Sequence, residues 1–435
     1  MSFWKSEALP AEWFKRQKVD QKTTKQLEND VKAIINQVII NGDVAIVKFA
    51  LKFDKAELTL RTLKVEAEEI KEAYKKAIPE QVSALKFMKE KVNTAQKQLL
   101  TQTEIKTTGD GISVQTVLRP IESVGCYVPG GQATYPSTLV MTAVPAKVAG
   151  VPRIVVCSPS DAKGKINPLV LVAADICGVD EVYRVGGVQA IAALAYGTTT
   201  IKPVRKIVGP GNKYVTAAKV MVSADVAIDM PAGPSEVLVL ADESADARFI
   251  AFDMVSQAEH GGDSIAGLIT TSEKVALQVQ KNLAKVSASA QRGEKISEAL
   301  AKYGFIIVCN SMEEAISLVN QFAPEHLEVM TNKPREVADQ LTAGLILLGP
   351  YSPVALSDYG SGTNHVLPTG GFAQSFSGLS ALDFTRRVSI IESSKTGLER
   401  VKENIKVMTE AENLPNHYKA IQIRFEKLAH PTKNG

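Results

Sequence analysis

The chain has 435 residues, of which 45% are hydrophobic and 22% are charged, and its formal net charge is +3. This length exceeds one ordinary core, so two or more domains are expected. The small net charge is spread along the chain, which excludes a basic nucleic-acid-binding face, and no apolar run is long enough to cross a bilayer. The first residues also lack the apolar run of a signal peptide, so we expect a cytoplasmic protein.

The N-terminal part of the chain has the pattern of helices. Between residues 24 and 102, apolar residues such as Val31 and Ile35 recur at helical spacing, and Gly42 is a plausible helix end. Pro79 can begin a further helix. Residues 103–120 change to alternation around Gly109-Asp110-Gly111, which predicts a β-hairpin.

From residue 121 to 240, short apolar strands alternate with helices rich in alanine and valine. This order predicts a parallel sheet with helices on both faces, and ligands of such sheets bind at the carboxyl ends of the strands. The expected strands are Ser123–Tyr127, Arg153–Cys157, Glu181–Val185, Lys206–Val208 and Val226–Ile228, and the expected helices include Leu139–Ala149 and Gln189–Ala195.

A second series of this kind follows, and a tail begins near residue 379. The expected strands of the second series are Val237–Ala241, Ile265–Thr270, Phe305–Cys309 and Leu345–Leu348. The tail has a strand-like segment, Arg387–Ile391, and two helices, the second of which can begin at Pro415. The two series predict an α/β fold with two parallel-sheet domains.

Three glycine-containing turns lie at predicted strand ends, at residues 127–132, 186–189 and 209–212. The chain has no GxGxxG, Walker A or GxSxG motif. A single glycine pair is more simply a tight strand–helix turn. Three of them at strand ends point to the binding of a nucleotide or a phosphate group.

Gln257 and His260 are three residues apart at the end of a helix expected to start near Ala245. That spacing places both side chains on one helix face, where they can bind one ion. A histidine at a helix end can equally be a cap. Asp263, Asp358 and His417 add further donors, and a mixed nitrogen and oxygen set suits zinc.

Glu325 and His326 are adjacent and follow Pro324. Such a pair suits two proton-transfer roles in one pocket, although Glu325 can also be a favourable charge in the first turn of a helix. The four cysteines have no CxxC spacing and are expected to be buried thiols without a catalytic role.

In combination, these stretches resemble the histidinol dehydrogenase family along essentially the whole chain. The motifs that carry the resemblance are Val-Pro-Gly-Gly (128–131), Gly-Pro-Gly-Asn (209–212), Ile-Asp-Met-Pro-Ala-Gly-Pro-Ser-Glu (228–236), Gln-Ala-Glu-His-Gly (257–261), Ala-Pro-Glu-His-Leu (323–327), Ser-Gly-Thr-Asn-His-Val-Leu-Pro-Thr (361–369) and Glu-x-Leu-x-x-His (412–417).

The resemblance implies a zinc-dependent enzyme that oxidises L-histidinol through the aldehyde to L-histidine and reduces two NAD. His326 would be the base that takes the alcohol proton, and Glu325 would activate water. The implied zinc ligands, which also contact substrate, are Gln257, His260, Asp358 and His417. Ser235, His326 and Glu412 would contact the substrate, and Tyr127, Gln189 and Asn212 would contact the nucleotide. We expect His365 to support the loop that bears Asp358, and His430 to lie at the surface.

The resemblance also implies a homodimer with one zinc per subunit and sites shared between subunits, in which Glu412 and His417 reach the partner's site. The domains would be incomplete Rossmann-like units. Residues 1–23 would form a helical extension, residues 24–126 and 237–378 the domain with the zinc and catalytic residues, residues 127–236 an inserted nucleotide-binding domain, and residues 379–435 a tail that contacts the partner.

Two alternatives remain open on the residues themselves. A zinc hydrolase needs only the metal and the Glu325–His326 pair, but it leaves the glycine turns at 186–212 without a role. The second alternative is a protein that binds a nucleotide or an imidazole and has no catalytic activity. Formation of NADH from histidinol distinguishes the dehydrogenase from both.

Overall fold

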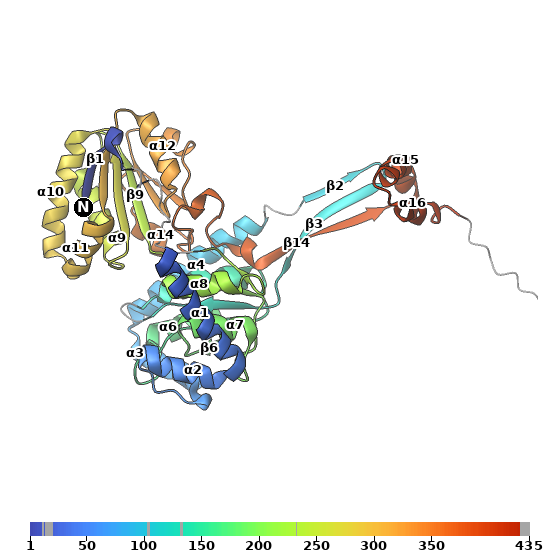
Figure 1. Cartoon of the computed structure of the whole chain (residues 1–435), viewed down its shortest axis with the longest axis horizontal. Coiled ribbons are helices and arrows are strands. Elements are labelled where there is room, and N and C mark those ends of the chain that lie inside the picture. The colour runs from blue at the N-terminus through green and yellow to red at the C-terminus, as the bar shows by residue number, and fades with distance from the viewer. Residues whose placement is uncertain (11–12, 14–20, 102–104, 131–133, 232, 427–435) are drawn as a thin grey trace, which may run out of the picture. The chain divides into compact units, whose positions relative to one another are not determined.

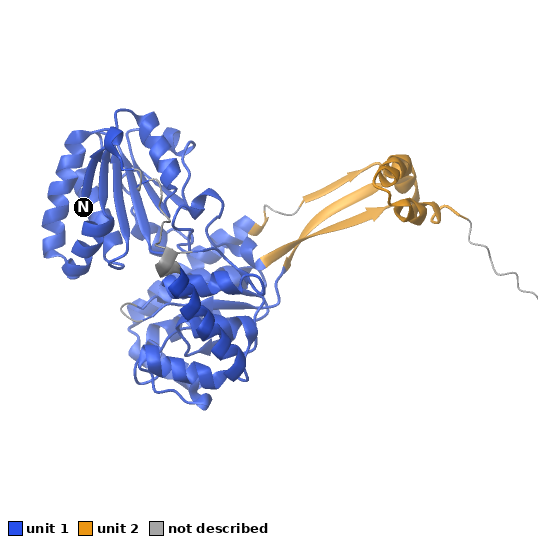
Figure 2. Cartoon of the chain, in the orientation of Figure 1, with its two compact units in different colours: residues 1–99, 120–384 blue, residues 100–119, 385–435 orange. Residues whose placement is uncertain are grey.

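The computed structural model describes residues 1–10, 13, 21–101, 105–130, 134–231 and 233–426. It has two compact units (Figure 2): unit 1 comprises residues 1–99 and 120–384, and unit 2 comprises residues 100–119 and 385–435. The expectations that fall on residues 11–12, 14–20, 131–133, 232 and His430 lie outside the described residues. None of the described helices is long and apolar enough to cross a membrane.

Unit 1 contains a six-stranded parallel sheet with the strand order β1-β11-β10-β9-β12-β13. Helices α10 and α11 cover one face of this sheet and α12 covers the other (Figure 1). The strands are β1 (Ser2–Lys5), β9 (Glu236–Ala241), β10 (Ile265–Thr270), β11 (Phe305–Val308), β12 (His326–Met330) and β13 (Leu345–Leu348), and the helices are α9 (Ala247–Ala258), α10 (Glu273–Ser289), α11 (Gly293–Tyr303) and α12 (Met312–Phe322).

Strand β12 turns its alternate side chains to two different cores. Leu327 and Val329 pack in the core on the α12 face. Met330 packs in the core formed with α9, α10 and α11. Because successive side chains of a strand alternate, His326 and Glu328 belong to the same face as Met330. The face that carries His326 is therefore the one against which α9 packs.

A second, five-stranded parallel sheet of unit 1 has the order β6-β5-β4-β7-β8. Helices α7 and α8 share one apolar core with the N-terminal helices α1 and α2, while α5 contacts β4 and β5. The strands are β4 (Val124–Tyr127), β5 (Ile154–Cys157), β6 (Glu181–Tyr183), β7 (Lys206–Val208) and β8 (Ala227–Ile228), and the helices are α1 (Gln21–Asn41), α2 (Asp43–Phe49), α5 (Pro136–Val148), α6 (Pro168–Cys177), α7 (Gly187–Tyr196) and α8 (Lys213–Val222).

The other helices of unit 1 are α3 (Ala67–Lys76), α4 (Pro79–Thr101), α13 (Pro334–Ala338) and α14 (Val354–Tyr359). Helix α3 packs on α6. Helix α4 begins at Pro79, as predicted, and its last two residues belong to unit 2.

The described residues of unit 2 form a three-stranded sheet, order β14-β3-β2, and two helices. The turn of its hairpin holds the start of α15, because the amide of Ser394 donates to the carbonyl of Gly111 at 2.8 Å and Arg400 pairs with Asp110 at 2.9 Å. The elements are β2 (Ile105–Gly109), β3 (Ile112–Pro120), β14 (Thr385–Ser393), α15 (Lys395–Ala411) and α16 (Pro415–Gln422).

The α/β fold with two parallel sheets is confirmed, as are the hairpin and the start of α16 at Pro415. Three features differ from the sequence-based expectations. Residues Ser2–Lys5, expected in a helical extension, form β1 and pair with β11. Strand β12 was not predicted. Helices α1 and α2, expected to belong with the six-stranded sheet, pack on the five-stranded one.

Candidate active site

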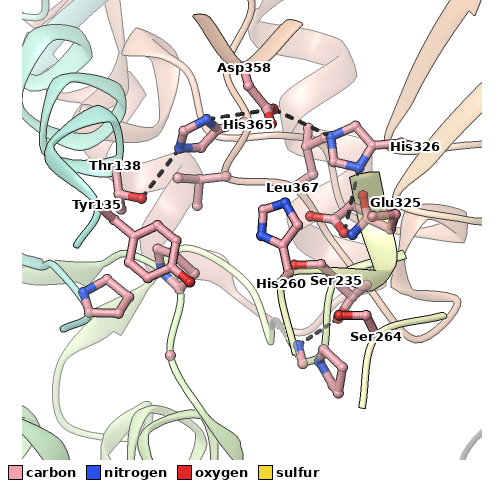
Figure 3. A pocket seen from close by; sticks show the side chains of 18 of the residues that line it. Tyr135, Thr138, Ser235, His260, Ser264, Glu325, His326, Asp358, His365 and Leu367 are labelled. Carbon is pink, nitrogen blue, oxygen red and sulfur yellow. Dashed lines mark hydrogen bonds and ion pairs between the residues drawn. The ribbon is translucent and has the colours of Figure 1, made fainter. Parts of the chain in front are cut away.

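A cavity of about 310 Å³ in unit 1 collects most of the residues selected from the sequence. Figure 3 shows the imidazoles of His260, His326 and His365 gathered with the Asp358 carboxylate around it. Residues that follow strands of the five-stranded sheet complete its lining. The lining of the cavity includes Thr138, Asn212, Ser235, Gln257, His260, Glu325, His326, Asp358, His365 and Thr369.

The two sheets contribute opposite ends of their strands to this cavity. Residues 210–213 follow the carboxyl end of β7, as expected for a parallel sheet. Ser235 instead precedes β9, and Glu325 and His326 lie at the start of β12. The sequence-based expectation of carboxyl strand ends concerned only the series at residues 121–240, and the six-stranded sheet instead lines the cavity with residues at the amino ends of its strands.

Glu236, the first residue of β9, holds the Glu325–His326 pair from both its backbone and its side chain. Its amide donates to Glu325 Oε2 at 2.7 Å, and its carbonyl lies 3.2 Å from His326 Nδ1. Its carboxylate, which is only 2% exposed, accepts the amide of Glu325 at 3.3 Å and the amide of Gly370 at 2.9 Å. One residue thus contacts the backbone of Glu325 and the side chains of both members of the pair.

The imidazole of His326 is arranged to work through Nε2. Because the Glu236 carbonyl can only accept, the hydrogen bond at Nδ1 requires a proton there, which leaves Nε2 as the free nitrogen of the neutral ring. Burial by itself lowers the pKa of His326, but the Glu325 and Asp358 carboxylates outweigh it, so the pKa lies above the usual value. Both features suit an imidazole that accepts a proton.

Asp358 lies between two imidazoles. Its Oδ1 is 4.0 Å from His326 Nε2 and 3.7 Å from His365 Nδ1. Burial raises the pKa of Asp358, while His326 and His260 oppose the shift. His365 is held from its other side by Thr138, with Nε2 3.4 Å from Oγ1, and burial together with His326 and His260 lowers its pKa to about 3. His365 is therefore a neutral ring beside Asp358.

The donors expected for zinc are divided between the two units. Gln257, His260 and Asp358 line the cavity, whereas His417 and Glu412 belong to unit 2. Helix α9 ends at Ala258, so His260 lies beyond the helix rather than on its face, which corrects the sequence-based placement. Asp263 also lines the cavity.

Three buried polar atoms on this wall have no hydrogen-bond partner among the residues that the structure describes: Nε2 of Gln257, Nε2 of His326 and Oδ1 of Asp358. Among the described residues, no three His, Cys, Asp or Glu side chains lie close enough together to hold a metal by themselves. An amide, an imidazole and a carboxylate with unfilled bonding capacity nevertheless form a donor set that suits zinc when a further ligand is supplied.

The glycine turn after β7 is held very close to β4. Gly209 has a φ of +115°, and a Cβ at this position would lie 2.2 Å from the Tyr127 carbonyl oxygen. A buried ion pair holds the turn, since Asp229 accepts the amide of Gly209 at 2.8 Å and Lys219 donates to its carbonyl at 2.8 Å. Asn212 then caps α8 by accepting the amides of Tyr214 and Val215 at 3.0 and 3.2 Å.

The other two residues expected at the nucleotide lie near α7. The amide of Gly187 donates to the hydroxyl of Tyr127 at 3.1 Å. Gln189 is 1% exposed, and its Oε1 has no hydrogen-bond partner among the described residues. Tyr127 and Gln189 are not among the described residues that line the 310 Å³ cavity, whereas Asn212 is.

Sequence reasoning missed Glu236 and Thr369, which hydrogen-bond residues at the cavity. Thr369 Oγ1 accepts the amide of Gly233, and Glu236 stands at the start of the apolar run Val237–Ala241. A carboxylate directly before a buried strand was the available signal. The four cysteines are buried, and burial raises the thiol pKa of each one, which agrees with inert core thiols.

Comparison with known proteins agrees with these features. Residues 16–425 match the family model described as histidinol dehydrogenase. Curated histidinol dehydrogenases are similar along most of the chain: that of Bacteroides fragilis (strain YCH46) is 45% identical over 407 residues, covering 93% of this chain and 94% of the relative, and that of Methanocaldococcus jannaschii is 45% identical over 398 residues, covering 91% and 92%. The crystal structure of histidinol dehydrogenase from Elizabethkingia anophelis superposes with a TM-score of 0.90 at 37% identity and covers 98% of each chain.

Proposed function

The chain belongs to the histidinol dehydrogenase family, and on that basis we propose that it oxidises L-histidinol through L-histidinaldehyde to L-histidine, with one zinc ion per subunit and reduction of two NAD. The observation that supports this proposal beyond the family match is the Glu325–His326 pair. Both residues line one cavity, both are held by Glu236, and His326 keeps Nε2 without a hydrogen-bond partner among the described residues.

Gln257, His260, Asp358 and His417 would hold the zinc, which when bound fixes the imidazole and amino nitrogens of the substrate. Ser235 lines the same cavity and would contact the substrate together with His326 and Glu412. Glu412 and His417 belong to unit 2. On the family resemblance alone, we propose that they act in the partner's site of a homodimer.

In the first oxidation, His326 Nε2 takes the proton of the substrate alcohol while hydride leaves the same carbon for NAD, which Tyr127, Gln189 and Asn212 would bind. The charge that forms on the ring is stabilised by the neighbouring Glu325 and Asp358 carboxylates, 3.6 and 4.0 Å away. The raised pKa of His326 expresses the same preference for the protonated ring.

In the second oxidation, Glu325 removes a proton from a water molecule that attacks the aldehyde carbon. Its Oε2 is held by the amide of Glu236, which leaves Oε1 to meet the water. As the water adds, protonated His326 returns its proton to the aldehyde oxygen. The resulting hydrate then gives up a second hydride to NAD, with the now neutral His326 again taking a hydroxyl proton. Two adjacent proton acceptors are needed because the two half-reactions remove protons from different oxygens at one carbon.

The test supplies zinc-loaded protein with histidinol and NAD and follows the absorbance of reduced nicotinamide, with two NADH expected per histidinol. His326→Asn should lower kcat about 10²–10⁴-fold, the usual contribution of a general base, and retain histidinol binding. Glu325→Gln should slow aldehyde oxidation and largely spare the alcohol step. Absence of NADH from the parent overturns the dehydrogenase, and equal slowing of both half-reactions by Glu325→Gln overturns the division of roles.

A further inference from the structure

Glu328 is a buried carboxylate on the face of the six-stranded sheet that also carries His326, and its neighbours on adjacent strands are apolar. It is 1% exposed and lies opposite Val239 of β9 in the register of the sheet. Val237, Val239, Ala241 and Met330 share this face and pack in the core beneath α9. A carboxyl group at such a place is costly unless its polar atoms are satisfied, so its partners are informative.

Glu328 has two partners, from two different helices. Its Oε1 accepts the amide of Val354, the first residue of α14, at 3.0 Å. Its side chain also faces that of Asp253 in α9, close enough for the two carboxyl groups to bond when one of them is protonated. No donor among the described residues reaches Glu328 Oε2. A bond between two carboxyl groups requires a proton on one of them, so a bonded pair shares one proton and one negative charge.

The surroundings of the pair favour this protonation. Burial raises the pKa of Asp253 to about 6. Burial and then the charge of Asp253 raise the pKa of Glu328 well above its ordinary value. A protonated acid bound to its conjugate base is stable in an apolar core in a way that two separate carboxylates are not.

The three elements that meet at this pair each carry a residue of the active site. Asp253 is four residues before Gln257 on α9, Glu328 is two residues after His326 on β12, and the Val354 amide is four residues before Asp358 on α14. Residues at i and i+4 of a helix share a face, and residues at i and i+2 of a strand share a face. Each contact of the pair therefore lies one helical turn or two strand residues from a residue that lines the cavity.

We propose that Asp253 and Glu328 are positioning residues, a hydrogen-bonded acid pair that fixes α9, β12 and α14 to one another and thereby sets the relative positions of Gln257, His326 and Asp358. The positioning of the three elements does not depend on the proposed function. Only the identity of the ion that Gln257 and Asp358 would help to hold rests on that function.

The test compares Glu328→Gln, Glu328→Leu and a matched control, Val329→Ala. Gln keeps an oxygen for the Val354 amide and offers an N–H to Asp253, whereas Leu removes both bonds. Val329 is on the same strand but faces the opposite core, so its truncation reports a general loss of stability without touching the pair.

The first readout needs no metal. Hydrogen exchange of the peptide that spans α14 is measured by mass spectrometry in metal-free protein, with the expectation of faster exchange in Glu328→Leu and parent-like exchange in Glu328→Gln and Val329→Ala. The second is zinc affinity by chelator competition. Glu328→Leu should bind about 10–100-fold more weakly, the usual effect of losing a residue that supports a ligand, and Glu328→Gln should restore the parent value.

Parent-like exchange across α14 in Glu328→Leu overturns the proposal, whether or not zinc binds. Equal weakening of zinc binding in Glu328→Leu and Val329→Ala also overturns it, because the effect is then one of stability alone. The proposed function fails by a different result, the absence of zinc-dependent NADH formation in the parent, so the two failures are distinguishable.

Discussion

Replacement of Glu236 by glutamine tests whether one buried carboxylate holds the Glu325–His326 pair. The carboxylate accepts two backbone amides, from Glu325 at 3.3 Å and Gly370 at 2.9 Å, and it is 2% exposed. Glutamine has one acceptor oxygen. Its amide group would therefore point N–H bonds at one of the two backbone N–H groups, so one hydrogen bond is lost and two donors face each other without solvent.

The magnitude follows from these contacts. A hydrogen bond to a charged group contributes about 1.5–3 kcal/mol, and a buried donor without a partner costs about 1–3 kcal/mol. The two effects overlap, so we expect the free energy of unfolding to fall by about 2–4 kcal/mol. Because Glu236 contacts both Glu325 and His326, a shift of about 1 Å in the pair should lower kcat on the order of 10²-fold, with a smaller effect on substrate binding.

The assay combines urea unfolding, followed by circular dichroism, with steady-state NADH formation. Glu243→Gln, at an exposed position just beyond β9, is the control for removal of one negative charge. Stability of Glu236→Gln within about 0.5 kcal/mol of that control, the usual range for surface substitutions, would refute the energetic reasoning. A loss of stability with parent-like kcat would refute the link from Glu236 to the catalytic pair.

Two further predictions concern the glycine turn and the acid pair. Gly209→Ala places a Cβ 2.2 Å from the Tyr127 carbonyl oxygen at a φ of +115°, so we expect the free energy of unfolding to fall by about 2–4 kcal/mol from overpacking and strain, and the KM for NAD to rise. The control Gly349→Ala, with a φ of +78° and open space around its Cβ, should leave that KM unchanged. Equal KM values for the two variants would contradict the role of the turn. In the acid pair, the pKa of Asp253 is raised in the folded protein to about 6, whereas the unfolded value is about 4. The group therefore stabilises the fold fully below about pH 4, and this contribution is lost as pH rises through about 6, so the free energy of unfolding of the parent should fall across this range relative to Asp253→Asn/Glu328→Gln. Parallel pH profiles of the two proteins would contradict this expectation.

The sheets could be predicted where their strands are apolar throughout. Val237–Ala241 and Ile265–Thr270 read as buried strands, and both are. Strand β12 has the sequence His-Leu-Glu-Val-Met, in which two of the five side chains are ionisable. Its polar residues contact Glu236, Asp253 and Val354, which are distant from them in the sequence. A local pattern cannot report these contacts.

The packing partners of the N-terminal segment could not be read from periodicity either. The helical pattern of α1 predicts an apolar stripe but not the surface that covers it, which is the core around α7 and α8. Strand β1 pairs with β11, about 300 residues later in the chain. Four residues with such a distant partner carry no local signal for a parallel strand.

The position of the Glu325–His326 pair at the start of β12 explains how two adjacent residues can line one cavity. Inside a regular strand, Glu325 and His326 would point to opposite faces of the sheet. Glu325 instead precedes the strand, after a turn in which Ala323 has a φ of +44°, so its direction is set by the turn and by the amide of Glu236. His326 takes its direction from the strand and from the carbonyl of the same Glu236. The amide and the carbonyl of Glu236 thus hold the Glu325 carboxylate and the His326 imidazole next to each other. Glu236 can do this because it is the first residue of β9, and backbone groups at the end of a strand remain available to side chains. Two adjacent residues can therefore face one cavity at the amino end of β12, which explains why this pair does not follow the usual placement of ligand sites at the carboxyl ends of parallel strands.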